Sequence, residues 1–106
     1  MNVLLVLFIF FFLYSAKSQN INYSDLDKLK GLYFYRPSNI PFTGDITGLI
    51  KGRFVKGKKE GEHTKFYKNG NILSKSNYKN NIPNGVWLEF HYNGNLLSKR
   101  NYNNGK

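Results

Sequence analysis

The sequence predicts an all-β protein: an antiparallel β-hairpin repeat array, arranged as a meander in a single elongated sheet, after an N-terminal signal peptide. Residues 54–77 and 78–101 are the same unit written twice, with no gap between the two copies. Turn motifs divide each unit into two short runs rich in aromatic and branched residues, with no helical spacing. Units of this length bury their apolar faces by stacking on neighbours, so the period predicts an array of hairpins.

Residues 1–18 are expected to be a signal peptide. Every residue from Val3 to Tyr14 is apolar or aromatic. This run is shorter than a bilayer helix of roughly 20 residues and matches the apolar region, about 7–15 residues long, of a secretory signal. Ala16 and Ser18 have the spacing of a cleavage site, which predicts a cut after Ser18. We therefore expect export to the periplasm, the outer envelope or the medium; an uncleaved membrane anchor and a buried core helix are the alternatives.

Residues 19–53 are predicted to form an N-terminal cap and a degenerate first repeat. We expect a helical turn from Asp25 to Lys30, capped by Ser24, with Leu26 and Leu29 facing the sheet. The elements expected after it are a strand at Leu32–Tyr35, a turn at Arg36–Asn39, a bend at Pro41–Asp45 and the run Ile46–Phe54. This segment would cover the open face of the first hairpin.

Residues 54–106 are predicted to hold two 24-residue hairpin repeats and part of a third. The turns fall at Lys56-Gly57, Asn69-Gly70, Asn80-Asn81, Asn93-Gly94 and Asn104-Gly105. We expect type I′ turns at the Asn-Gly pairs, because both central positions need positive φ. Gly61 and Gly85 open the long strand of each unit and are expected to mark bulges or close backbone approaches.

The predicted core consists of positions that are apolar in both repeats. Phe54, Tyr78 and Tyr102 recur at the repeat period and are expected to form a ladder across the strands, each pair adding roughly 0.2–1 kcal/mol. The other core candidates are Phe66 and Phe90, Ile72 and Leu96, and Leu73 and Leu97. The absence of cysteine excludes a lipoprotein anchor and disulfides, so packing alone must hold the fold.

The chain is strongly basic, and the excess lies in the repeats. Without residues 1–18, which include Lys17, there are 15 basic and 6 acidic side chains, a balance of +9. Residues 51–106 hold twelve Lys or Arg but only three Glu. Such a surplus attracts phosphate, anionic lipid headgroups or acidic proteins. The alternative interpretation is solvated strand faces whose lysines prevent aggregation through sheet edges.

Catalysis and metal binding are not expected. Each histidine stands where the other repeat has an aromatic residue: His63 matches Trp87, and His91 matches Tyr67. Both are interpreted as aromatic positions on strands, and no base recurs beside the repeated Ser74 and Ser98. The prediction is no catalytic residue, no cofactor and no metal. A small hydrolase built on these four side chains is the alternative.

The pattern Gly-x-Trp-x-x-Phe-x-x-Asn-Gly-x-Leu-x-Ser, at Gly85 to Ser98, resembles the bacterial variant of the MORN repeat, the kind labelled YwqK-type antitoxin repeat protein. The segments Gly31–Tyr35 and Pro41–Gly44 look like the preface of that family. The first unit departs from the pattern in His63, where Trp is preferred, and in Asn81, where Gly is usual. The resemblance implies a MORN-like meander that acts as a scaffold, with membrane attachment among its associated roles.

Binding is the function that these features favour. An array presents repeated side chains on one extended face, and the candidate binding residues are Lys65, Tyr67, Lys75, Trp87, His91, Tyr92, Lys99 and Arg100. We expect an exported, non-enzymatic module that mediates protein–protein or anionic envelope and membrane-surface association. Export disfavours nucleic acid as a partner. The alternative is an intracellular antitoxin-like protein that binds a toxin or nucleic acid.

Self-association is a further expectation. The third unit begins but is not completed, so the strand that ends at Tyr102 would offer unpaired backbone groups. Two chains are then expected to join through this C-terminal edge strand.

Overall fold

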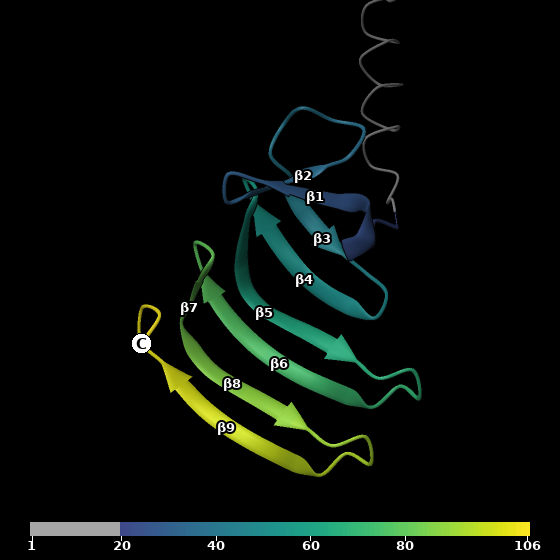
Figure 1. The fold of residues 1–106 in the computed structure, drawn as a ribbon, viewed down its shortest axis with the longest axis vertical. Coiled ribbons are helices and arrows are strands. Elements are labelled where there is room, and N and C mark those ends of the chain that lie inside the picture. The colour runs from purple at the N-terminus through teal and green to yellow at the C-terminus, as the bar shows by residue number, and fades with distance from the viewer. Residues whose placement is uncertain (1–19) are drawn as a thin grey trace, which may run out of the picture.

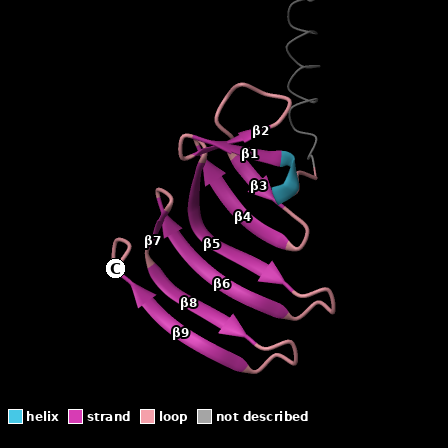
Figure 2. Ribbon diagram, viewed as in Figure 1, coloured by secondary structure: helices cyan, strands magenta, loops and turns pink. Residues whose placement is uncertain are grey.

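The computed structural model describes residues 20–106, so the predicted signal peptide at 1–18 lies outside the described residues. Within this range the protein is all-β and antiparallel, as predicted (Figures 1 and 2). The single helical element of the described part is the short 3₁₀ turn η1, Tyr23–Asp25. Within residues 20–106, no helix has the length and apolarity that are needed to cross a bilayer.

The main sheet has seven strands and contains both repeats (Figure 1). Six strands follow one another in the order β3-β4-β5-β6-β8-β9, and β7 pairs with β6. Their bounds are β3 Gly44–Ile46, β4 Ile50–Val55, β5 Lys58–Phe66, β6 Ile72–Lys79, β7 Ile82–Pro83, β8 Gly85–Phe90 and β9 Leu96–Tyr102. Because neighbours in the sheet are also neighbours in sequence, the predicted meander is confirmed.

The N-terminal segment is a separate two-stranded sheet, so the strands do not all belong to one sheet. It consists of β1, Leu26–Leu29, and β2, Leu32–Tyr35, and it lies across the end of the main sheet that carries β3 and β4 (Figure 1). Backbone hydrogen bonds hold it there: the Tyr33 amide of β2 donates to the Gly57 carbonyl in the turn between β4 and β5, and the Phe42 amide, just before β3, donates to the Tyr33 carbonyl. This hairpin, with the residues from Ile21 to Phe42 around it, is called the cap below.

The predicted helical turn at Asp25–Lys30 is wrong. The 3₁₀ turn ends at Asp25, and Leu26 starts a strand whose partner strand follows a two-residue turn at Lys30-Gly31, with φ of 52° and 80°. Strand alternation buries Leu26 but leaves Leu29 62% exposed, so the two leucines do not share a face. The left-handed Lys-Gly pair closes a hairpin that local helix propensity did not reveal.

The run Ile46–Phe54 is also divided. Ile46, which is 2% exposed, ends β3, and the chain turns back at residues 47–49 before β4 begins at Ile50. Gly48 has φ of 101°, a conformation that favours glycine. The hairpin of β3 and β4 therefore replaces the single continuous run that was predicted.

The turns of the array fall into two classes, one at each end of the strands. Two-residue turns with positive φ at both positions close the hairpins at Lys56-Gly57 and Asn80-Asn81, and the same conformation recurs at Asn104-Gly105. At Asn69-Gly70 and Asn93-Gly94 only the glycine has positive φ. Type I′ turns are therefore present at the three two-residue turns. The prediction of type I′ turns at Asn69-Gly70 and Asn93-Gly94 is wrong.

The second class is a longer loop. The amide of Gly70 donates to the carbonyl of Tyr67 at 3.0 Å, and the Tyr67 amide donates to the carbonyl of Asn71 at 2.8 Å. A turn followed by a left-handed glycine adds one residue to the hairpin, and the strand register shifts between Lys65 and Phe66. The same arrangement recurs one repeat later, from His91 to Asn95.

Aromatic rings form a continuous ladder over one face of the sheet. Phe54, His63, Tyr78, Trp87 and Tyr102 follow one another with ring centroids 5.2, 5.3, 5.5 and 4.8 Å apart. The predicted Phe54, Tyr78 and Tyr102 positions are thus confirmed, and the rings between them come from β5, which carries His63, and β8, which carries Trp87. Tilted and edge-on rings at these distances attract one another beyond the burial of their surface.

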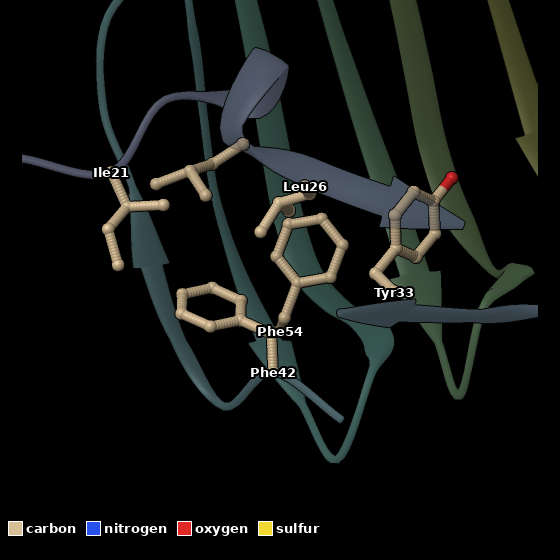
Figure 3. Close-up of a cluster of buried hydrophobic side chains, with 6 residues drawn as sticks. Ile21, Leu26, Tyr33, Phe42 and Phe54 are labelled. Carbon is tan, nitrogen blue, oxygen red and sulfur yellow. The ribbon is translucent and has the colours of Figure 1, made fainter. Parts of the chain in front are cut away.

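The closed core lies where the cap covers this ladder (Figure 3). The side chains of Ile21, Leu26, Tyr33 and Phe42 surround Phe54, which is completely buried. Its ring lies 5.0 Å from the ring of Tyr33 and 5.8 Å from that of Phe42. Phe54 therefore joins the repeats to the cap.

The other core candidates are not buried. Leu96 and Leu97 are 54% and 56% exposed, and Phe66, Phe90, Ile72 and Leu73 are half-buried. These residues lie at the strand ends next to the longer loops, beyond the reach of the cap. Their recurrence as apolar residues in both repeats correctly predicted that they lie on strands. No described element packs over them.

The most tightly packed glycine of the described part is Gly52, a position that the repeat pattern did not indicate. A Cβ on Gly52 would lie 2.4–2.5 Å from three ring atoms of His63, whereas nothing lies within 4 Å of one on Gly61. A Cβ on Gly85 would meet Asn77 at 3.2 Å. The predicted close approach is therefore confirmed at Gly85, while Gly61 is required only for its φ of 77°.

Candidate functional site

The register of the strands defines two faces of the sheet. Lys51, Thr64, Lys75, Leu88 and Lys99 stand directly opposite one another on successive strands from β4 to β9. Residues paired in this way share a face. We call this the lysine face, and the opposite one, which carries the aromatic rings, the ladder face.

Three lysines on the lysine face form a row across the strands. Lys51, Lys75 and Lys99 are each separated by one repeat and lie on alternate strands, so their backbones are about 10 Å apart. Both ion pairs within residues 20–106 use arginine, joining Arg36 to Asp27 and Arg53 to Asp45. None of the three lysines of the row therefore forms an ion pair with a carboxylate of the described part, although Glu62 stands on the same face.

Apolar side chains run beside the lysine row. Phe66 pairs with Ile72, and Phe90 pairs with Leu96, one step nearer the longer loops. The ammonium group of Lys51 lies 5.4 Å from the centre of the Phe66 ring, which places that ring on the lysine face. The face is therefore amphipathic, with a row of positive charge next to a row of apolar groups.

The eight predicted binding residues do not lie on one face. Lys75 and Lys99 belong to the lysine face, whereas Lys65, Trp87 and Arg100 belong to the ladder face. The remaining three lie in the longer loops or at their borders: Tyr67, His91 and Tyr92. The Tyr67 and Tyr92 rings are 5.1 Å apart, and the Tyr67 hydroxyl donates to the carbonyl of Phe90 at 2.8 Å, so these loops support each other.

Sequence reasoning missed Lys51 because the repeats were counted from residue 54. The period itself contained the necessary information, since Lys51 precedes Lys75 by one full unit. The loop position of His91 also corrects the interpretation of that residue as part of a strand.

A groove lies on the ladder face. It has a volume of about 330 Å³, and its lining includes Tyr23, Lys59, Lys65, Ser74, Tyr78 and Trp87. Tyr23 comes from the cap, and the others come from β5, β6 and β8. The groove therefore combines two cations, hydroxyl groups and aromatic rings at the junction of cap and array.

The Lys59 side chain is half-buried in this groove. Its ammonium group lies 4.8 Å from the centre of the Tyr78 ring and 5.6 Å from that of Tyr33, a cation–π arrangement with both. Burial lowers the pKa of Lys59, and the positive charges of Lys65 and Lys28 lower it further. The groove thus holds concentrated positive charge.

His63 forms part of the groove wall and is only 6% exposed. Its Nε2 lies 2.9 Å from the carbonyl oxygen of Arg53, and its ring packs between Phe54 and Tyr78. Burial lowers the pKa of His63, partly offset by the Arg53 carbonyl. These contacts agree with an aromatic position in the ladder.

The two serines do not share an environment. Ser98 donates its hydroxyl to Glu89 at 2.9 Å, while Ser74 is buried on β6 opposite Lys65. No group of three or more His, Asp or Glu side chains within residues 20–106 is arranged to hold a metal ion.

Lowering the pH should destabilise the protein through His63. Its pKa is about 6.5 in the unfolded chain and lower in the fold, so the unfolded state binds the proton more readily. The contribution of neutral His63 is complete above the unfolded pKa and is lost as the pH falls below about 6.5 towards the folded pKa. We expect the thermal midpoint to decrease as the pH is lowered from about 7.5 to about 5.5. The variant His63→Phe should show a weaker dependence on pH.

His91→Asn is the control for this experiment, since His91 is exposed in a loop. It should retain the pH dependence of the parent protein. Equal slopes for the parent and His63→Phe would show that other groups cause the effect.

The comparison with protein families gives a match to the repeats. Residues 59–80 and 83–104 each match the family model described as MORN repeat variant. The second matched segment begins one repeat after the first, at residue 83 against residue 59, which agrees with the period of the sequence and of the strands. No curated protein and no solved structure matches the chain. The two segments that match the MORN repeat variant are therefore successive β-hairpins of one sheet.

Proposed function

We propose that this chain is an exported, non-enzymatic binding module whose lysine face associates with anionic envelope or membrane surfaces, or with an acidic protein. A MORN repeat domain is present, and such domains are generally binding or repeat modules. The single observation that carries the proposal is the lysine row, Lys51, Lys75 and Lys99, unpaired by any carboxylate of the described part.

The apolar row supports a surface as the partner. Leu96 is 54% exposed, and Phe90 and Phe66 are half-buried beside the lysines. Lysines next to apolar side chains suit an interface in which ammonium groups meet phosphates and the apolar groups reach the acyl boundary. The bacterial form of the repeat, which Gly85–Ser98 resembles, fits this proposal because a bacterial envelope offers anionic surfaces.

Neutralising the lysine row should strongly weaken binding to anionic vesicles. We expect the protein to sediment with phosphatidylglycerol-containing vesicles at low salt and not with pure phosphatidylcholine vesicles. Each lysine near an anionic surface contributes about 1 kcal/mol, so the triple variant K51Q/K75Q/K99Q should bind roughly 100-fold more weakly. Binding should also weaken between 0.01 and 0.15 M salt, as the Debye length falls from about 30 to 8 Å.

The triple variant K28Q/K68Q/K106Q removes the same charge from other places on the molecule and should bind nearly as well as the parent. Equal losses in the two variants would mean that net charge, and not the row, determines binding. Indifference to salt and lipid charge would contradict the electrostatic proposal altogether. Export is checked separately by locating the full-length gene product and its N-terminus in cell fractions.

A further inference from the structure

We propose a second binding site, separate from the lysine face: the groove of the ladder face takes an acidic side chain of an extended peptide, held between Lys59 and Lys65. This inference does not depend on the proposed function, because the two sites lie on opposite faces of the sheet. The partner is a polypeptide segment that carries Glu or Asp.

The first observation that supports this proposal is the positive charge of the groove. Lys59 and Lys65 line it together, and neither forms an ion pair with another residue of the range 20–106. Glu89 is the single carboxylate among the described lining residues, and its Oε1 already accepts the hydroxyl of Ser98. An anion entering the groove would therefore meet two cations whose charges repel each other at present.

The position of Lys59 strengthens this attraction. Its side chain is half-buried, and its ammonium group is held over the rings of Tyr78 and Tyr33. A buried ammonium has lost part of its hydration, so a carboxylate beside it interacts in a lower effective dielectric than at an exposed lysine. The Lys59 amine is thus preorganised as an anion contact.

Neutral donors surround the same space. Ser74 stands opposite Lys65 and Ser76 stands opposite His63, both on β6, and both line the groove. Within residues 20–106 neither hydroxyl takes part in a hydrogen bond. Both hydroxyls are therefore available to donate to a carboxylate oxygen or a peptide carbonyl.

Size and shape favour a peptide segment over a folded surface. A volume of about 330 Å³ lies at the lower end of ligand pockets and holds only a small number of side chains. The walls contributed by Trp87, Tyr78 and Tyr23 are aromatic, which suits the aliphatic stem of Glu beneath its charged end. The groove therefore fits an acidic side chain of an extended peptide better than it fits the surface of a folded protein.

The single tryptophan of the protein reports on this site. Trp87 lines the groove, and the sequence contains no other tryptophan. We expect hexaglutamate to change the Trp87 fluorescence in a saturable manner at low salt, and hexaglutamine to leave it unchanged. The K59Q/K65Q variant should bind hexaglutamate at least about tenfold more weakly.

The matched control is K68Q/K106Q, which removes the same charge from two exposed positions outside both the groove and the lysine row. It should change the affinity for hexaglutamate less than about threefold. Since Lys59 packs on two rings, K65Q alone provides a second test: Lys65 is exposed, so this variant should fold normally and still weaken binding.

Three results would overturn the inference: no fluorescence change with hexaglutamate, equal binding of hexaglutamate and hexaglutamine, or equal losses in the two double variants. Inorganic phosphate tests the ligand class, because competition by phosphate as effective as that of the peptide would assign the groove to small anions. Failure here would leave vesicle binding through Lys51, Lys75 and Lys99 unaffected, so the two proposals are distinguished.

Discussion

Replacing Phe54 with alanine is expected to destabilise the protein by about 3–5 kcal/mol, the largest effect of any single truncation in the array. Phe54 is completely buried, and its ring contacts those of Tyr33, Phe42 and His63 at centroid distances of 5.0, 5.8 and 5.2 Å. Truncation leaves a cavity at the point where the cap meets the repeats. Urea denaturation followed by Trp87 fluorescence measures the loss.

Phe66→Ala is the matched control for this prediction. It removes the same side chain from a half-buried position on the lysine face, where the ring contacts the ammonium group of Lys51. A distinctly smaller loss of stability is expected, because less apolar surface returns to water. Similar losses for the two variants would contradict the assignment of Phe54 as the centre of the core.

Replacing Gly52 with alanine should cost about 1–3 kcal/mol, although it adds only one methyl group. That methyl carbon would lie 2.4–2.5 Å from three atoms of the His63 ring. The ring cannot move aside freely, because its Nε2 is held by the Arg53 carbonyl and its faces and edges pack on Phe54 and Tyr78. The free energy of unfolding in urea is again the measurement.

A double-mutant cycle tests the cause of this effect. In the His63→Ala background the ring is absent, so Gly52→Ala should cost much less than in the parent protein. Additive losses would show that the backbone of Gly52, and not the contact with His63, makes the substitution unfavourable. The cycle therefore separates packing from backbone conformation.

The repeats could be predicted from the sequence because local and global patterns agree there. The repeat period, the turn motifs and the ladder positions Phe54, Tyr78 and Tyr102 all indicate the same hairpins. The cap was harder to predict, because Asp25–Lys30 has the composition of a helical turn. Its strand conformation is fixed by pairing with Leu32–Tyr35 across the left-handed turn.

The binding faces could not be predicted from recurrence alone. Assigning residues to faces requires an unbroken alternation, and the register shifts near Gly52, at Lys65/Phe66 and at Glu89/Phe90 interrupt it. Lys65 and Lys75 are both basic and both on strands, yet they point to opposite sides. The cap residue Tyr23 enters the groove only through tertiary packing, which leaves no trace in the repeat.

The lysine row has a low linear charge density. One charge about every 10 Å is far sparser than the roughly one charge per 1.7 Å of duplex DNA, and this spacing is close to the Debye length of about 8 Å at physiological ionic strength. Neighbouring lysines in the row therefore scarcely raise one another's electrostatic potential. The affinity of such a strip therefore depends on how many lysines contact the surface, and it grows by multivalency with one lysine for each 24-residue period.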